Sequence, residues 1–117
     1  EVRSVARAFG VRDLPDTEDW MACFAGADRG DGRRPVPARD RAAQMLRDAV
    51  VGSLVPLASA GALAGIDTPR TQSLITLTET LLGADVAASG RRLDTVGIRA
   101  GDVDSARRAF DALMEAR

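Results

Sequence analysis

Histidine is absent from the sequence, and cysteine occurs once, as Cys23. Without histidine the chain lacks the commonest general base and the commonest metal ligand, so it cannot by itself run a histidine-dependent mechanism. Carboxylates are the main remaining metal ligands, and acidic pairs such as Asp102 and Asp104 are typical of helix starts. We therefore expect no metal site, and we interpret Cys23 as a small core residue.

Phosphate-binding glycine motifs are missing as well. No Gly-x-Gly-x-x-Gly follows a strand pattern and no Walker-type Gly-Lys-Ser/Thr occurs, so the chain carries no nucleotide-binding domain of its own. The 16 basic and 17 acidic residues leave a net charge of −1, which argues against nucleic acid as a partner. We find no signal peptide and no apolar stretch near about twenty residues, and we expect a soluble, cytoplasmic protein without a membrane partner.

Alanine and aliphatic residues dominate what is present. The 117 residues include 21 alanines and only 3% aromatic residues, a composition that favours closely packed helices. The length is that of one domain, and no stretch alternates apolar and polar residues for long enough to predict a strand. We predict an all-α fold, a single compact helical bundle over residues 1–117 with a core of Leu, Val and Ala.

The first half predicts two short helices and a loop. Apolar spacing from Val2 to Phe9 predicts a helix that Gly10 ends with a left-handed cap. A second helix is predicted to begin at Asp16. Residues 28–37 are rich in Gly, Pro and charge, and are predicted to form a mobile loop.

Two further helical pieces are predicted between residues 38 and 64. Pro56 lacks an amide hydrogen and clashes with the preceding turn, so a bend or break is expected near Gly52 and Ser53. Gly65 should cap the second piece.

A central core helix is predicted over about residues 69–82. Thr68 is placed to bond the free amides of its first turn, and Pro69 loses no bond at the first helical position. Gly83 should end this helix, and Asp102 should cap a last one after a short turn at residues 84–89. The apolar side of the core helix is predicted to be Leu74, Ile75, Leu81 and Leu82. That of the last helix is predicted to be Val103, Ala106, Phe110, Leu113 and Met114.

Three segments of the second half share their order and spacing with a known family. They are Leu54–Gly61 (LVPLASAG), Leu63–Pro69 (LAGIDTP) and Gly90–Ile98 (GRRLDTVGI). Together they resemble the C-terminal helical domain of the NAD(P)-dependent octopine/nopaline (opine) dehydrogenases, a bundle related to that of the 6-phosphogluconate-type dehydrogenases. The similarity covers about residues 38–98 and, more loosely, residues 5–10.

The resemblance implies a function that this chain does not carry alone. In the family an N-terminal Rossmann domain holds NAD(P)H, and the helical domain closes over it, contacts the substrate and often forms a subunit interface. The enzyme reductively condenses an amino acid with a 2-keto acid. NAD or NADP is therefore implied only through a missing nucleotide-binding domain or chain, and these residues alone are expected to be inactive as an oxidoreductase. Glu at position 1, in place of Met, hints that a tag, a processed end or a whole domain preceded it.

The family's polar motif is altered here. It reads approximately His-Arg-Tyr-x-x-Glu-Asp-Val-Pro, and its His, Arg and Asp hold and polarise the keto acid. Without a gap, alignment on Pro56 puts Ala43 at the His, Gln44 at the Arg, Asp48 at the Glu and Ala49 at the Asp. Only the acidic neighbour survives, which fits a catalytically altered relative.

Five residues are candidates for a site. Asp48 is the catalytic candidate, and the substrate-binding candidates are Gln44, Arg47, Arg91 and Arg92. The arginines and Asp48 also have alternative structural roles. An arginine that follows a helix can cap it or pair with an acidic residue, and Asp48 can simply lie on a helix surface. Two other functions fit the sequence: a stand-alone helical scaffold that binds or transforms a small apolar molecule, and a homodimeric interaction domain.

Overall fold

The computed structural model describes residues 1–14, 18, 38–99 and 101–115. Within these ranges the chain is helical and has no strand, which confirms the all-α class for them. Apart from Glu18, the helix predicted after Asp16 lies outside the described residues, as do the loop predicted over 28–37 and Cys23. The elements are α1 (Val2–Ala8), α3 (Arg39–Ala49), the π-helix η1 (Val50–Leu54), α4 (Val55–Leu63), α5 (Pro69–Leu82), the 3₁₀ turn η2 (Ala87–Ser89) and α6 (Val103–Glu115).

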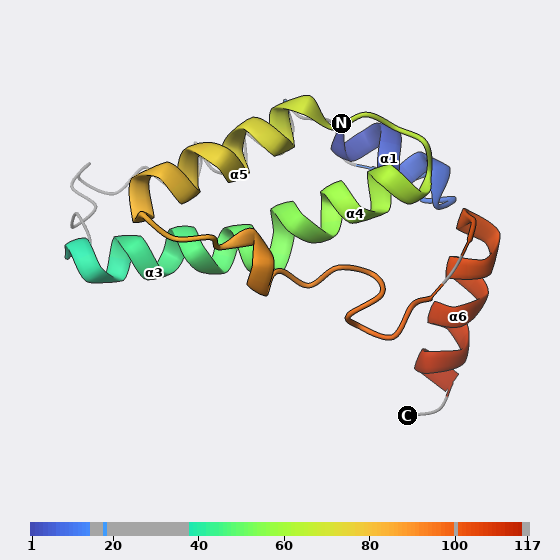
Figure 1. Ribbon diagram of the computed structural model, residues 1–117. Coiled ribbons are helices and arrows are strands. Elements are labelled where there is room, and N and C mark those ends of the chain that lie inside the picture. The colour runs from blue at the N-terminus through green and yellow to red at the C-terminus, as the bar shows by residue number, and fades with distance from the viewer. Residues whose placement is uncertain (15–17, 19–37, 100, 116–117) are drawn as a thin grey trace, which may run out of the picture.

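Figure 1 shows how these elements are arranged. α3, η1 and α4 form one long helical run, and α5 returns beside it in the opposite direction. α1 lies at the end of the molecule where α4 finishes and α5 begins, and α6 stands across that same end. The connection from α5 to α6 passes η1 and α4, so it can bring residues 87–98 against both.

The irregularity expected ahead of Pro56 is a π-helix. The Val55 N–H donates to the Val50 carbonyl, five residues back rather than four. Pro56 has no N–H to continue this pattern, and one wide turn centred on Gly52 accommodates it. The two predicted pieces, α3 and α4, are therefore present, but the helix does not break between them.

This continuity overturns one expectation. The run Arg39–Leu63 is 25 residues long and, by length and composition, apolar enough to cross a bilayer. The sequence was expected to hold no apolar stretch near about twenty residues. The core helix of a water-soluble protein meets the same test, so this run does not decide localisation, which stays a prediction.

The main core lies where η1, α4, α5 and η2 meet. Its buried residues are Val50, Val55, Ile75 and Val86. No leucine whose burial the structure describes is buried, so the prediction of a Leu, Val and Ala core is wrong for leucine. β-Branched residues fill the interior instead, and Leu54 and Leu82 pack against its edge.

Helix α5 has its predicted bounds and ends at Gly83 with a φ of 61°, but it turns a different face inward. Its buried residues are Thr71, Ile75 and Thr78. The Thr78 hydroxyl donates to the Leu74 carbonyl at 2.9 Å, which satisfies it inside the fold. The prediction that Leu74 and Leu81 belong to the core side is therefore wrong.

An apolar stripe remains on the outer side of α5. It consists of Leu74, Leu77 and Leu81, which are 50%, 55% and 67% exposed. These residues recur at three- and four-residue steps, so they form one continuous line along the helix. We call this line the leucine stripe.

The start of α5 is capped from outside the helix. Thr68 makes no side-chain cap, contrary to the prediction, and is buried with its Cγ2 beside Gly61. The Glu1 carboxylate takes over the cap: it accepts the N–H groups of Arg70 at 2.7 Å and Thr71 at 2.9 Å, and the Thr71 hydroxyl at 2.6 Å. Glu1 thus ties the beginning of α1 to the beginning of α5.

The other predicted caps are confirmed. Gly10 ends α1 with a φ of 84° while the Val11 N–H bonds the Ala6 carbonyl, and Gly65 follows α4 with a φ of 66°. Asp102 begins α6 by accepting the Ser105 N–H at 2.7 Å.

Fewer apolar side chains of α6 are buried than the spacing of its apolar residues predicts. Ala106 is buried, but Phe110 and Met114 are 53% and 57% exposed. The apolar side predicted for this helix is therefore only partly inside the fold.

Candidate functional site

Two of the three family-like segments, residues 54–61 and 90–98, meet at one junction in the structure. The Arg91 N–H donates to the Val51 carbonyl at 3.1 Å. In the π-helix pattern this carbonyl would pair with residue 56, which is proline and has no N–H. Arg91 therefore supplies, from the far segment, the hydrogen bond that Pro56 cannot make.

At the same junction the backbone of Gly90 lies very close to the Val55 side chain. A Cβ placed on Gly90 would lie 2.6 Å from Cβ and 2.7 Å from Cγ2 of Val55, so only glycine fits there. Three residues further on, the Leu93 N–H donates to the Ser59 hydroxyl at 3.2 Å. Gly61 makes a similar approach to Thr68, where a Cβ would lie 2.7 Å from Cγ2.

A cavity of about 290 Å³ opens beside this junction, between α4 and α5. We call it the α4–α5 cavity. Its apolar lining comes from Val55, Ala58, Ala62 and Ile75. Its polar lining residues are Arg92, Gln72 and Ser59. A guanidinium and an amide suit a carboxylate or carbonyl oxygen, and none of the residues that line this cavity is an acid.

The structure separates the five predicted site residues. Gln44, Arg47 and Asp48 lie on α3, where Gln44 Nε2 donates to Asp48 Oδ1 at 2.7 Å on an exposed surface. Neither Arg47 nor Asp48 lines the α4–α5 cavity, whereas Arg92 does. Arg91 takes part through its backbone N–H and holds the junction. Their roles toward a substrate stay predictions.

Sequence reasoning missed Gln72 and Ser59. Gln72 sits one turn into α5, one residue after the buried Thr71, and no motif marks it. Ser59 lies inside the family-like segment 54–61, but its hydroxyl gains a role only once residue 93 is folded against it. Both positions depend on tertiary contacts that local spacing does not encode.

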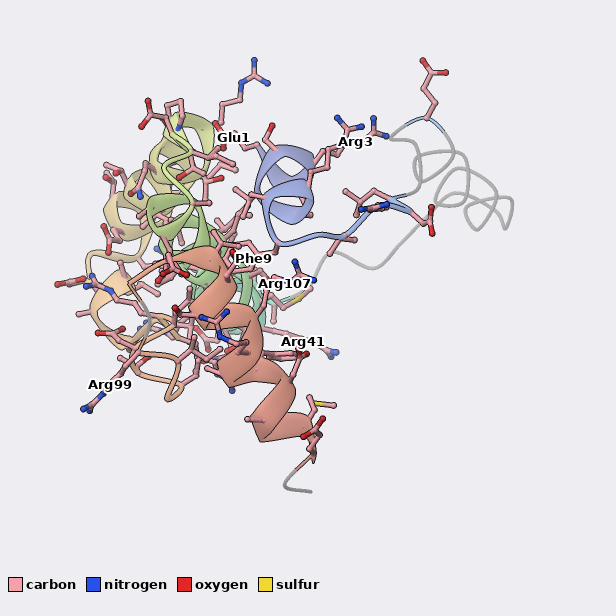
Figure 2. All side chains as sticks on the ribbon, turned by 90° about the vertical axis from the view of Figure 1, so that its right-hand side faces the viewer. Glu1, Arg3, Phe9, Arg41, Arg99 and Arg107 are labelled. Carbon is pink, nitrogen blue, oxygen red and sulfur yellow. The ribbon has the colours of Figure 1, made fainter. Side chains whose placement is uncertain are left out.

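A second, larger hollow is lined by other residues of α4, Pro56, Leu57 and Ala60. It has a volume of about 590 Å³ and is formed by Phe9 and Val11 just after α1, by α4 and α6, and by Leu93 and Ile98. We call it the α6 groove. Its lining includes Phe9, Pro56, Leu57, Ala60, Ile98 and Phe110, with Arg107 and Asp111 from α6. Phe9 and Arg107 lie next to each other in Figure 2, at the end where α1 and α6 meet.

Hydrogen bonds at the starts of α5 and α6 lower the pKa values of two carboxyl groups. The Thr71 hydroxyl, with the N–H groups of Arg70 and Thr71, holds the pKa of the Glu1 carboxyl below its ordinary value of 4.5. The Ser105 N–H does the same for the pKa of Asp102, ordinarily 3.8. Across the described part of the chain, no group of three or more His, Cys, Asp or Glu side chains could hold a metal ion.

No family model, curated protein or solved structure matches this chain.

Proposed function

We propose that this chain is the helical domain of an opine-dehydrogenase-like protein, which contacts substrate and associates with a nucleotide-binding domain or with a second copy. The observation that supports this most is the packing of two of the family-like segments, residues 54–61 and 90–98. Gly90 lies against Val55, the Leu93 N–H donates to the Ser59 hydroxyl, and Arg91 bonds Val51 just ahead of the first segment. Two of the segments that carry the resemblance therefore belong to one packed unit.

Two surfaces of this unit suit the proposed role. The α4–α5 cavity offers Arg92 and Gln72 to a carboxylate substrate such as a 2-keto acid. The leucine stripe of α5 offers apolar surface that the described residues leave uncovered, as expected for a face that meets another domain. The redox cofactor, NAD or NADP, belongs to that other domain in this proposal.

The native reading frame is the first test. We expect it to encode a strand, a Gly-rich turn and a helix of the dinucleotide-binding type upstream of residue 1, or in a companion chain. We also expect the 117 residues alone to bind neither NADH nor NADPH in a calorimetric titration. Tight binding of either nucleotide by these residues alone would contradict the proposal.

Kinetics of the complete protein test the substrate role. With its nucleotide-binding domain present, NAD(P)H oxidation should depend on an amino acid and a 2-keto acid together. Arg92→Gln should raise KM for the keto acid about tenfold, the effect of losing one charge-assisted hydrogen bond. Arg99→Gln, at an exposed position that does not line the cavity, is the matched control and should leave KM unchanged. Equal effects of the two variants would show that the cavity does not bind the keto acid.

The α6 groove favours a second candidate function. Its volume of about 590 Å³ and its mainly apolar lining suit a small apolar molecule, which was the alternative function foreseen from the sequence. This function needs no nucleotide-binding domain.

A further inference from the structure

The α6 groove combines an apolar interior with a single cation at its edge. Phe9, Leu57, Ile98 and Phe110 are among the side chains that line it, and they come from four separate parts of the chain. A volume of about 590 Å³ lies within the range of small-molecule sites, which are mostly apolar with a few polar groups that fix orientation. The body of a ligand there should therefore be apolar.

The cation is Arg107, which is exposed among the residues that the structure describes. Its guanidinium lies against the backbone of Gly10, where a Cβ would come within 3.1 Å of Cζ and Nη1. Glycine at position 10 thus makes room for the arginine at the edge of the groove. Among the residues that the structure describes, Arg107 forms no hydrogen bond or ion pair. A guanidinium can hold a carboxylate through two parallel hydrogen bonds.

Asp111 limits the charge that a ligand can carry. It lines the same groove one helical turn after Arg107. Its carboxylate repels a second anionic group, and the remaining lining offers no other charged partner. One carboxylate with an apolar tail is therefore favoured over a dicarboxylate or a phosphate ester.

We propose that the α6 groove binds a medium-chain fatty acid, with its carboxylate on Arg107 and its alkyl chain along α4 between Leu57 and Ala60. The site is separate from the α4–α5 cavity and does not depend on the function proposed for that cavity. Burial of the alkyl chain supplies most of the affinity, and Arg107 supplies the selectivity for an acid over an alcohol.

Octanoate, octan-1-ol and octanedioate are the probes, titrated into the ¹⁵N-labelled chain and followed by amide chemical shifts. We expect saturable octanoate binding with shifts at residues 9–11, 57–60 and 106–111, and octan-1-ol and octanedioate should each bind about tenfold more weakly. Arg107→Gln should weaken octanoate about tenfold and leave octan-1-ol unchanged. Arg108→Gln, the neighbouring exposed arginine on α6, is the matched control and should change neither.

A filling substitution tests the position of the tail. Ala60→Phe places a ring in the groove and should abolish binding of both octanoate and octan-1-ol, while the far-ultraviolet circular dichroism spectrum confirms that the helices persist. The proposal is overturned if octanoate does not saturate, if octan-1-ol binds as tightly as octanoate, or if Arg107→Gln and Arg108→Gln act alike. A dimeric chain that binds no octanoate would show that a second copy fills the groove, and this also overturns it.

Discussion

The Glu1 carboxylate accepts a 2.6 Å hydrogen bond from the hydroxyl of Thr71, a residue 70 positions further along the chain. It also receives the first free N–H groups of α5, from Arg70 and Thr71. These amides are the positive end of the helix dipole, where a negative charge is favourable. One side chain thus replaces the local cap expected of Thr68 and fastens α1 to α5.

Glu1→Gln should lower the melting temperature at pH 7, because the neutral amide keeps the size of the side chain but loses the charge that the helix start attracts. Asp13→Asn removes a charge at an exposed position and serves as the control, with no expected change. Thermal unfolding followed by circular dichroism measures both. Equal melting temperatures of wild type and Glu1→Gln would show that the carboxylate does not stabilise α5.

The same contact predicts a pH dependence. Since the folded-state pKa of Glu1 is lowered, its stabilisation is fully present above the ordinary value of 4.5 and is lost as the pH falls through the lowered value. The melting temperatures of wild type and Glu1→Gln should therefore converge as the pH is lowered from 4.5. Thr71→Val, which removes the hydroxyl, should move the Glu1 pKa back toward its ordinary value in a side-chain NMR titration. A pH-independent gap between wild type and Glu1→Gln would contradict this account.

Gly90 is predicted to be intolerant of any side chain. Gly90→Ala brings a methyl group into the Val55 side chain, and such overpacking costs about 1–3 kcal/mol of unfolding free energy. Gly52→Ala is the matched control, since a Cβ there meets nothing within 4 Å and alanine is favoured over glycine in a helix by about 0.5–1 kcal/mol. In urea unfolding, Gly90→Ala should therefore lower the free energy of unfolding and Gly52→Ala should raise it. A neutral Gly90→Ala would mean that the junction is loose.

Pro56 should affect the protection of the Arg91 amide against hydrogen exchange. Pro56→Ala restores a helical N–H that competes with Arg91 for the Val51 carbonyl. We expect faster hydrogen exchange at the Arg91 amide in the variant, with the amides of α5 unchanged. Unaltered exchange at Arg91 would show that the N–H of residue 56 does not compete for the Val51 carbonyl.

Local signals predicted the ends of the helices well. Glycine caps at positions 10, 65 and 83, and the Asp102 cap, depend only on residues within one turn, and all four are present. The irregularity at residues 50–54 was also foreseen, because the missing N–H of Pro56 is a local defect. What sequence could not provide was the repair of that defect by Arg91, which lies 40 residues away from Val51.

Burial was the weaker part of the prediction, for a physical reason. On α5 the stripe of Leu74, Leu77 and Leu81 and the stripe of Thr71, Ile75 and Thr78 have equivalent helical spacing, so spacing cannot say which faces inward. Leucine is the more hydrophobic choice, yet the threonine side is buried. Close contact with α4 and η1 and the bond from Thr71 to Glu1 orient the helix. The same reason explains why Gln72 was not predicted as a site residue. Gln72 lines the cavity with Arg92 only because α5 has this orientation.

The leucine stripe yields the last prediction. Leu77→Gln replaces a side chain that is 55% exposed with a good helix former, so unfolding free energy should change by less than about 0.5 kcal/mol. Ile75→Ala, on the opposite and buried face, should cost about 2–5 kcal/mol. If the stripe meets a second copy or a nucleotide-binding domain, Leu77→Gln should weaken that association in sedimentation velocity, because a polar amide would then be buried without a partner. Unchanged sedimentation of Leu77→Gln in the presence of that partner would place the interface elsewhere, and a strongly destabilised Leu77→Gln would show that the stripe belongs to the interior of the fold.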